Sequence, residues 1–166
     1  MMTIQKKWLS VCVSIGMGIF SVAQTRAEHA QIELVVRGKE VQKVAIADQE
    51  PPLGGVNPRP LLKVKANEPL VMQFILTNIY PHGVVNAVKV RYFVVKVKQT
   101  KQKQVPDLKT GVVTMGTIVM NFKPKCKVGA RLRFRVSEPG VYLVRSDTVH
   151  TKSDHEHFSS IDLVVE

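Results

Sequence analysis

Apolar and polar side chains alternate with a period of two along most of the chain after residue 30. The clearest case is residues 130–136, where three apolar side chains alternate with three arginines. They are Arg131, Leu132, Arg133, Phe134, Arg135 and Val136. Successive side chains of a β-strand point to opposite faces of its sheet. This segment therefore predicts a strand with one buried face and one solvated, cationic face.

Other segments show the same alternation or a continuous β-branched run, and turn residues separate them. Their ranges are 31–37, 40–47, 61–66, 70–78, 87–98, 112–122, 141–149 and 160–165. A Pro/Gly-rich stretch at 50–60 and a polar, lysine-rich stretch at 99–108 predict loops. Eight or nine short strands at even spacing predict an all-β protein, an antiparallel Greek-key β-sandwich.

The N-terminal segment has a different pattern, apolar without alternation. Lys6 and Lys7 precede an apolar run over residues 8–22. A positive start followed by such a run is typical of a secretory signal, and the run is shorter than the ~20 residues that a membrane-spanning helix needs. We predict a helical signal peptide and, after its removal, no membrane span. An uncleaved N-terminal anchor is the alternative.

Small residues place the signal cleavage site after Ala23 or after Ala27, and Ala27 is preferred. This divides the chain into a signal peptide, residues 1–27, and a single β-sandwich domain, residues 28–166. The predicted location of the mature protein is the periplasm or the extracellular medium.

Cleavage changes the cysteine count and the charge. Cys12 leaves with the signal, so the mature domain keeps only Cys126 and has no intramolecular disulfide. We expect an inert loop thiol at Cys126, and the lysines on both sides of it make a reactive thiol or an intermolecular disulfide the alternative. Removing Lys6, Lys7 and Arg26 from the 24 basic residues, against 13 acidic ones, lowers the formal charge from +11 to +8. The mature domain is thus still strongly basic.

Two segments carry a family resemblance. They are KVKANEPLVMQFILTNIYPH at 63–82 and EPGVYLVRSDTVH at 138–150, the latter followed by IDLVV at 161–165. Together they resemble the cupredoxin-like and immunoglobulin-like sandwiches of exported bacterial proteins, over about half of the mature chain. The resemblance implies a corner tyrosine at Tyr142, whose hydroxyl would bond a nearby backbone group.

The cupredoxin-like part of the resemblance implies a copper site built from one Cys, two His and often a Met. His82 and His150 stand near the two histidine positions, but Ser146 stands where the cysteine ligand would be, and no methionine occupies the fourth position. A blue-copper centre needs a thiolate ligand. We therefore do not expect blue-copper electron transfer.

Another metal site is an alternative. In an extended segment His155 and His157 point to the same side, and together with His82 and His150 they would supply nitrogen donors suited to Cu(II) or Zn(II). The simpler interpretation of 150–157 is a solvated loop. We expect no cofactor, with a copper or zinc ion on these four histidines as the alternative.

Basic side chains concentrate between residues 123 and 135. They are Lys123, Lys125, Lys127, Arg131, Arg133 and Arg135. If they share a face, they predict a surface for an anionic partner, either an envelope polymer or an acidic protein. Export argues against nucleic acid as that partner.

Motifs of catalysis are missing from the sequence. It has no Gly-x-Ser-x-Gly elbow and no glycine-rich phosphate loop between a strand and a helix, so no catalytic residue is predicted. The leading hypothesis is a non-enzymatic exported sandwich that serves as a binding or structural module of the cell envelope. The alternative is a periplasmic copper- or zinc-binding protein.

Overall fold

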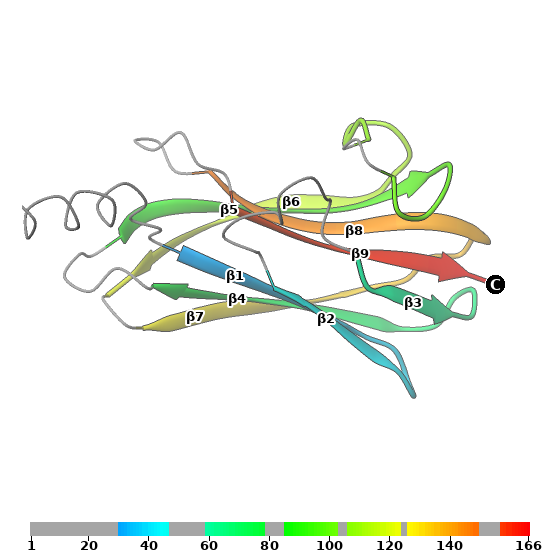
Figure 1. Ribbon diagram of the computed structural model, residues 1–166, viewed down its shortest axis with the longest axis horizontal. Helices are drawn as coiled ribbons and strands as arrows, with labels where there is room; N and C mark the ends of the chain where they lie inside the picture. Colours follow the sequence, from blue (N-terminus) through cyan, green and yellow to red (C-terminus); the bar gives the residue numbers. More distant parts are fainter. Residues whose placement is uncertain (1–29, 47–58, 79–84, 103–105, 124–125, 150–156) are drawn as a thin grey trace, which may run out of the picture.

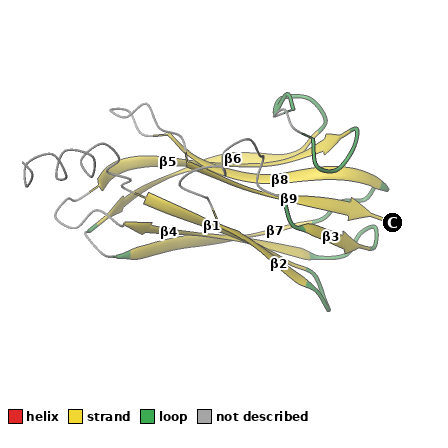
Figure 2. Cartoon of the chain, viewed as in Figure 1, coloured by secondary structure: helices red, strands yellow, loops and turns green. Residues whose placement is uncertain are grey.

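The computed structural model describes residues 30–46, 59–78, 85–102, 106–123, 126–149 and 157–166. Within these residues every regular element is a strand, and the strands form two layers (Figures 1 and 2). The strands are β1 (Ala30–Arg37), β2 (Gln42–Ile46), β3 (Leu61–Val64), β4 (Leu70–Asn78), β5 (Val85–Val97), β6 (Val112–Phe122), β7 (Lys127–Phe134), β8 (Gly140–Val149) and β9 (His157–Val165). The prediction of an all-β sandwich is confirmed, and the predicted signal peptide lies outside the described residues.

One layer is a four-stranded sheet in the order β2-β1-β4-β7, and the other is a five-stranded sheet in the order β3-β9-β8-β5-β6. The edges of the first sheet are β2 and β7, and those of the second are β3 and β6. Contacts between β6 and β7 show that these two edges lie on the same side of the sandwich. That side carries the candidate sites described below.

The expectation of a purely antiparallel arrangement was wrong at one pair, because β3 runs parallel to β9. Backbone hydrogen bonds hold this pair at both ends: Asp162 N–H donates to Pro60 O over 2.9 Å, and Glu166 N–H donates to Val64 O over 2.9 Å. Alternation within a strand determines which side chains are buried. It does not determine which edge the strand joins, so the sequence pattern could not predict this direction.

The core lies between the inner faces of the two sheets. Its largest side chains with almost no exposure are Tyr142, Phe74, Ile32, Leu34, Leu62, Leu70, Met72, Leu76, Ile161 and Leu163. Complete burial of one such aliphatic side chain contributes about 1.5–3 kcal/mol relative to leaving it in water. The domain is therefore held by ordinary apolar packing, in keeping with Cys126, the one cysteine of the described residues, which is free and exposed.

Two specific sequence predictions are confirmed near β8. The buried Tyr142 donates its hydroxyl hydrogen bond to the backbone oxygen of Glu138 over 2.8 Å, as expected for a corner tyrosine. In β7 the exposed and covered positions alternate strictly, with Phe134 and Val136 buried and the arginines exposed. The strand is longer than expected at its start, since it begins at Lys127 rather than at residue 130.

The described residues contain no helix of the length and apolar character that a membrane crossing requires.

Candidate functional site

Four exposed cationic side chains follow the free edge of the four-stranded sheet. Lys127, Arg131 and Arg133 belong to β7, and Arg135 comes directly after it. Because alternate residues of a strand lie about 7 Å apart, Arg131 and Arg133 form a regular row on the outer face. We call Lys127, Arg131, Arg133 and Arg135 the cationic edge.

Strand register adds side chains from β4 and β1 to this face. Arg131 lies opposite Gln73 of β4, and its Nε donates a hydrogen bond to Gln73 Oε1 over 3.1 Å. Arg133 lies opposite Val71, which in turn lies opposite the exposed Arg37 of β1. Arg37 and Gln73 were not predicted as site residues. The alternation in each strand shows which face they occupy, but only the register shows that they flank the arginines.

A hollow interrupts the cationic edge at Gly129. It has a volume of about 340 Å³ and lies over the β4–β7 ladder. Its lining residues are Gln73, Ile75, Lys127, Val128, Gly129, Ala130 and Arg131. A Cβ at Gly129 would lie 2.6 Å from the backbone oxygen of Phe74, so a larger residue would require the strands to move apart. The glycine thus permits close pairing and leaves open space between Lys127 and Arg131.

The electrostatics of the cationic edge differ from those of two other exposed lysines, Lys63 and Lys96, which have carboxylate partners. Lys63 pairs with Glu166 at 3.0 Å, and Lys96 pairs with Glu138 at 2.9 Å. Among the described residues no carboxylate forms an ion pair with Lys127, Arg131, Arg133 or Arg135. Guanidinium groups present several N–H donors in a planar fork that matches carboxylates and phosphates. The row can therefore hold anionic groups that repeat along a chain.

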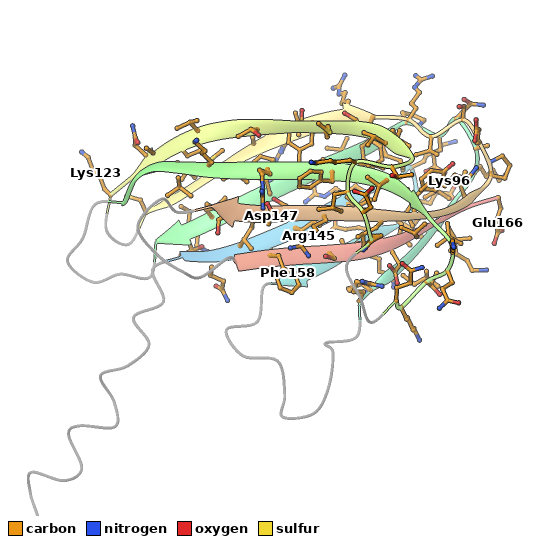
Figure 3. All side chains as sticks on the ribbon, turned by 90° about the horizontal axis from the view of Figure 1, so that it is seen from above. Lys96, Lys123, Arg145, Asp147, Phe158 and Glu166 are labelled. Atoms are coloured by element: carbon orange, nitrogen blue, oxygen red, sulfur yellow. The ribbon has the colours of Figure 1, made fainter. Side chains whose placement is uncertain are left out.

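The other predicted cations are only partly placed. Lys123 follows the end of β6, is exposed, and lies at one end of the sandwich, opposite the end that carries Lys96 and Glu166 (Figure 3). Lys125 lies outside the described residues. The structure thus groups Lys127 with the three arginines, and the wider six-residue surface stays a prediction.

The predicted metal ligands are mostly outside the described residues. This holds for His82, His150 and His155, while His157 is the first residue of β9 and its backbone pairs with Thr148. Among the residues that the structure describes, no group of three or more His, Cys, Asp or Glu side chains has the arrangement of a metal site. The copper or zinc alternative stays a prediction, which metal analysis of protein purified without a His tag would test.

Ser146, at the position where the cupredoxin-like part of the resemblance implied a cysteine ligand, is completely buried. Its hydroxyl has no hydrogen-bond partner within the described parts of the chain. The finer, cupredoxin-like part of the resemblance is not established by this geometry. The coarser part, a two-sheet sandwich of the immunoglobulin-like kind, is confirmed by the architecture.

A buried ionic cluster on the outer face of the five-stranded sheet was not foreseen. Asp147 of β8 accepts hydrogen bonds from Arg91 Nε over 2.7 Å and from Arg145 Nε over 3.1 Å. The Arg145 guanidinium lies 4.3 Å from the centre of the Phe158 ring, so it also makes a cation–π contact. Figure 3 shows Arg145, Asp147 and Phe158 close together. The alternation of β8 suggests a solvated outer face, yet Asp147 is only 1% exposed and Arg145 only 6%.

A second buried carboxylate continues this outer layer. Asp162 of β9 accepts a hydrogen bond from the backbone N–H of Lys101 over 2.7 Å. Its other oxygen lies 3.1 Å from Arg59 Nε, as an ion pair without the alignment of a hydrogen bond. These contacts fix two segments outside the strands against the sheet. The two buried carboxylates thus have structural partners, unlike the exposed cationic edge.

The fold and the cationic edge together define an all-β sandwich module with an exposed basic edge strand. No protein-family model and no curated protein sequence matches the chain.

Solved structures of low sequence identity resemble it. The CARDB domain of PF1109 from Pyrococcus furiosus is 12% identical, with 83% of this chain and 96% of that chain covered and a TM-score of 0.48. The PmoD soluble domain from Methylocystis sp. is 10% identical, with 81% and 90% covered and a TM-score of 0.46. The C-terminal domain of wzt is 11% identical, with 85% and 80% covered and a TM-score of 0.46.

Proposed function

We propose that this chain is a non-enzymatic, exported module of the cell envelope that binds an anionic polymer along its cationic edge. The observation that carries the proposal is the row of Lys127, Arg131, Arg133 and Arg135, exposed and without a carboxylate partner among the described residues. Four unneutralised cations in one row cost self-repulsion, which an anionic ligand relieves.

The arrangement favours a linear ligand over a small one. A row of side chains spaced at about 7 Å offers successive contacts to carboxylate, sulfate or phosphodiester groups of a polymer. The hollow at Gly129 leaves room for a substituent between two such contacts. The export part of the proposal rests on the signal-like residues 1–27, and the acidic-protein partner is the competing ligand.

Binding of heparin, a sulfated polysaccharide, tests the proposal. We expect the triple variant Arg131→Ser, Arg133→Ser, Arg135→Ser to bind heparin at least ten-fold more weakly than the wild type, measured by isothermal titration calorimetry. The slope of log affinity against log salt concentration should decrease by about 2–3, the number of released counterions lost with three cations.

A matched control separates the site from the overall charge. The triple variant Lys39→Ser, Lys43→Ser, Lys89→Ser removes the same charge from exposed positions in the β1–β2 hairpin and in β5, outside the cationic edge. We expect this control to lose little affinity. Equal losses in the two triple variants would contradict the proposal, because binding would then follow net charge alone. A purified acidic protein that binds better than heparin would favour the competing ligand.

A further inference from the structure

The edge strand β6 carries no charged residue along its whole length, VVTMGTIVMNF. Met115 is 56% exposed and Val119 is 60% exposed, both on the outer face of the sheet. Natural proteins usually protect a long exposed edge with charge, or keep the edge strand short. The other edges of the described sheets do so: β7 carries the cationic edge, while β2 and β3 are short and include Lys43 and Lys63. Within the described residues the β6 edge therefore has neither form of protection.

The regular part of β6 is symmetric about Thr117. Pairing between β5 and β6 is continuous from Thr114 to Met120, and the register shifts on either side of this stretch. Irregularities of this kind bend and twist a strand locally. The stretch between them is the part of the edge that another strand can join, and Thr117 is its central residue.

We propose that β6 pairs antiparallel with β6 of a second copy of this chain, around a two-fold axis at Thr117. The two five-stranded sheets would then form one continuous sheet. Isologous contacts of this type are the commonest way in which identical subunits associate. The observations behind this proposal concern β6 alone and not the cationic edge of β7, which lies on the same side of the sandwich.

A second copy of β6 fits this edge because the strand is complementary to itself. In this register Thr117 lies opposite Thr117 of the second copy, and Met115 lies opposite the second copy's Val119, twice by symmetry. On the other face Gly116 lies opposite Ile118, and Thr114 lies opposite Met120. Threonine pairs and apolar pairs at directly opposed positions stabilise a sheet. No position places a polar side chain of β6 against a charge, as a charged partner strand would.

The nearest charges of the five-stranded sheet do not oppose this pairing. Arg91 lies beside Thr117 on β5, and its Nε donates to Asp147 over 2.7 Å, so the carboxylate offsets its charge. Three strand spacings, about 14 Å, would separate the two Arg91 residues, which exceeds the screening length in physiological salt. Lys89 lies beside Val119 on β5. Across the dimer axis this row of opposed residues continues to Met115 and then Phe93 of the second copy, so Lys89 faces no second cation there.

Sedimentation velocity of protein expressed from the full-length sequence is the first test. We expect the wild type to dimerise reversibly, and Thr117→Lys to be monomeric because it places two like charges at the axis. The control is Val44→Lys, a similar change at a 40%-exposed position of the β2 edge, which should dimerise as the wild type does. A wild type that is monomeric up to millimolar concentration overturns the proposal, as does a Thr117→Lys dimer of unchanged stability.

Disulfide cross-linking tests the register itself and does not depend on a disruptive variant. Thr117→Cys is made in a background where Cys12 and Cys126 are both serine. The two Cβ atoms at the axis would be about 5 Å apart, close to the disulfide range, so oxidation should give a covalent dimer. Val119→Cys, on the same face of the regular part of β6, is the matched control, since its two copies would be about 14 Å apart. Cross-linking of both variants at the same rate, or of neither, overturns the proposed register.

Discussion

The strands β6 and β7 occupy equivalent places in the sandwich and have opposite chemistry. Both are edges, they follow each other in the chain, and they lie on the same side of the molecule. β7 places Lys127, Arg131 and Arg133 in solvent, whereas β6 exposes Met115 and Val119 and has no charge. Whether an edge strand exposes charged or apolar side chains to solvent is therefore determined by its outer-face residues and not by its position in the sheet.

The sheets behind the two edges differ as well. The outer face behind β7 holds polar and cationic side chains in water, with Arg131 hydrogen-bonded to Gln73. The outer face behind β6 holds the buried cluster in which Asp147 joins Arg91 and Arg145. The first arrangement leaves charge available to a ligand. The second uses its charges inside the protein and presents an apolar edge, which suits a permanent or self-complementary partner.

The largest expected effect is the loss of stability when the buried ionic cluster on the outer face behind β6 is broken. Asp147→Ala removes the carboxylate that two guanidinium groups share and leaves Arg145, 7% exposed in its side chain, as an uncompensated charge. Breaking a buried ion pair from one side typically costs about 3–5 kcal/mol. We expect that loss in the free energy of unfolding, measured by urea denaturation followed by circular dichroism.

Arg133→Ala in β7 is the comparison for that measurement. It removes a charge that lies in solvent, so the free energy of unfolding should change by no more than about 0.5 kcal/mol. Similar losses in the two variants would show that the faces behind β6 and β7 are not built differently. A much smaller loss for Asp147→Ala would mean that the cluster is more hydrated than its burial indicates.

Sequence patterns predicted the β7 side of this comparison well. Strict alternation in residues 130–136 was enough to place Phe134 and Val136 in the core and the arginines in water. The same rule applied to β8 fails at Arg145 and Asp147, which have the alternation of a solvated face and are buried. Their burial depends on neighbours that are distant in sequence, such as Phe158, and a local pattern contains no information on them.

Sequence reasoning also missed what only strand order reveals. The lack of charge in residues 112–122 is visible in the sequence, but it predicts an exposed apolar edge only once β6 is known to be an edge. The parallel direction of β3 and the approach of Arg37 to the arginine row depend on register in the same way. The histidine hypothesis is untested, because three of its four residues lie outside the described residues.

Salt concentration should have an effect of intermediate size, and it should act in opposite directions on heparin binding at β7 and on dimerisation at β6. Heparin binding to the cationic edge should weaken by about 50- to 150-fold between roughly 50 and 200 mM salt, because four cations release counterions when they bind. Dimerisation through β6 should instead become slightly stronger, since salt screens the repulsion between two molecules of net positive charge. Fluorescence anisotropy with labelled heparin and sedimentation velocity at the two salt concentrations measure both. If both weaken together, the dimer depends on charge and the separation of the two edges is wrong.

The smallest expected effect comes from an exposed ion pair that links the turn after β7 to β5, the strand that supports β6. Hydrogen bonding and attraction to Lys96 lower the pKa of Glu138 below its usual 4.5, and Glu138 raises the pKa of Lys96 above its usual 10.5. The lowered pKa stabilises the fold above about pH 4.5 and the effect is lost as pH falls through the folded value. The raised pKa of Lys96 stabilises the fold below about pH 10.5, and this effect is lost as pH rises through the folded value.

We therefore expect Glu138→Gln to be slightly less stable than the wild type between these limits, and the difference in melting temperature to vanish in acid and in strong alkali. Since water screens both side chains, this difference in stability at neutral pH should be smaller than the effects expected for Asp147→Ala and for salt concentration. A difference that persists unchanged at pH 2 would mean that Glu138 acts through its packing near Tyr142 and not through its charge.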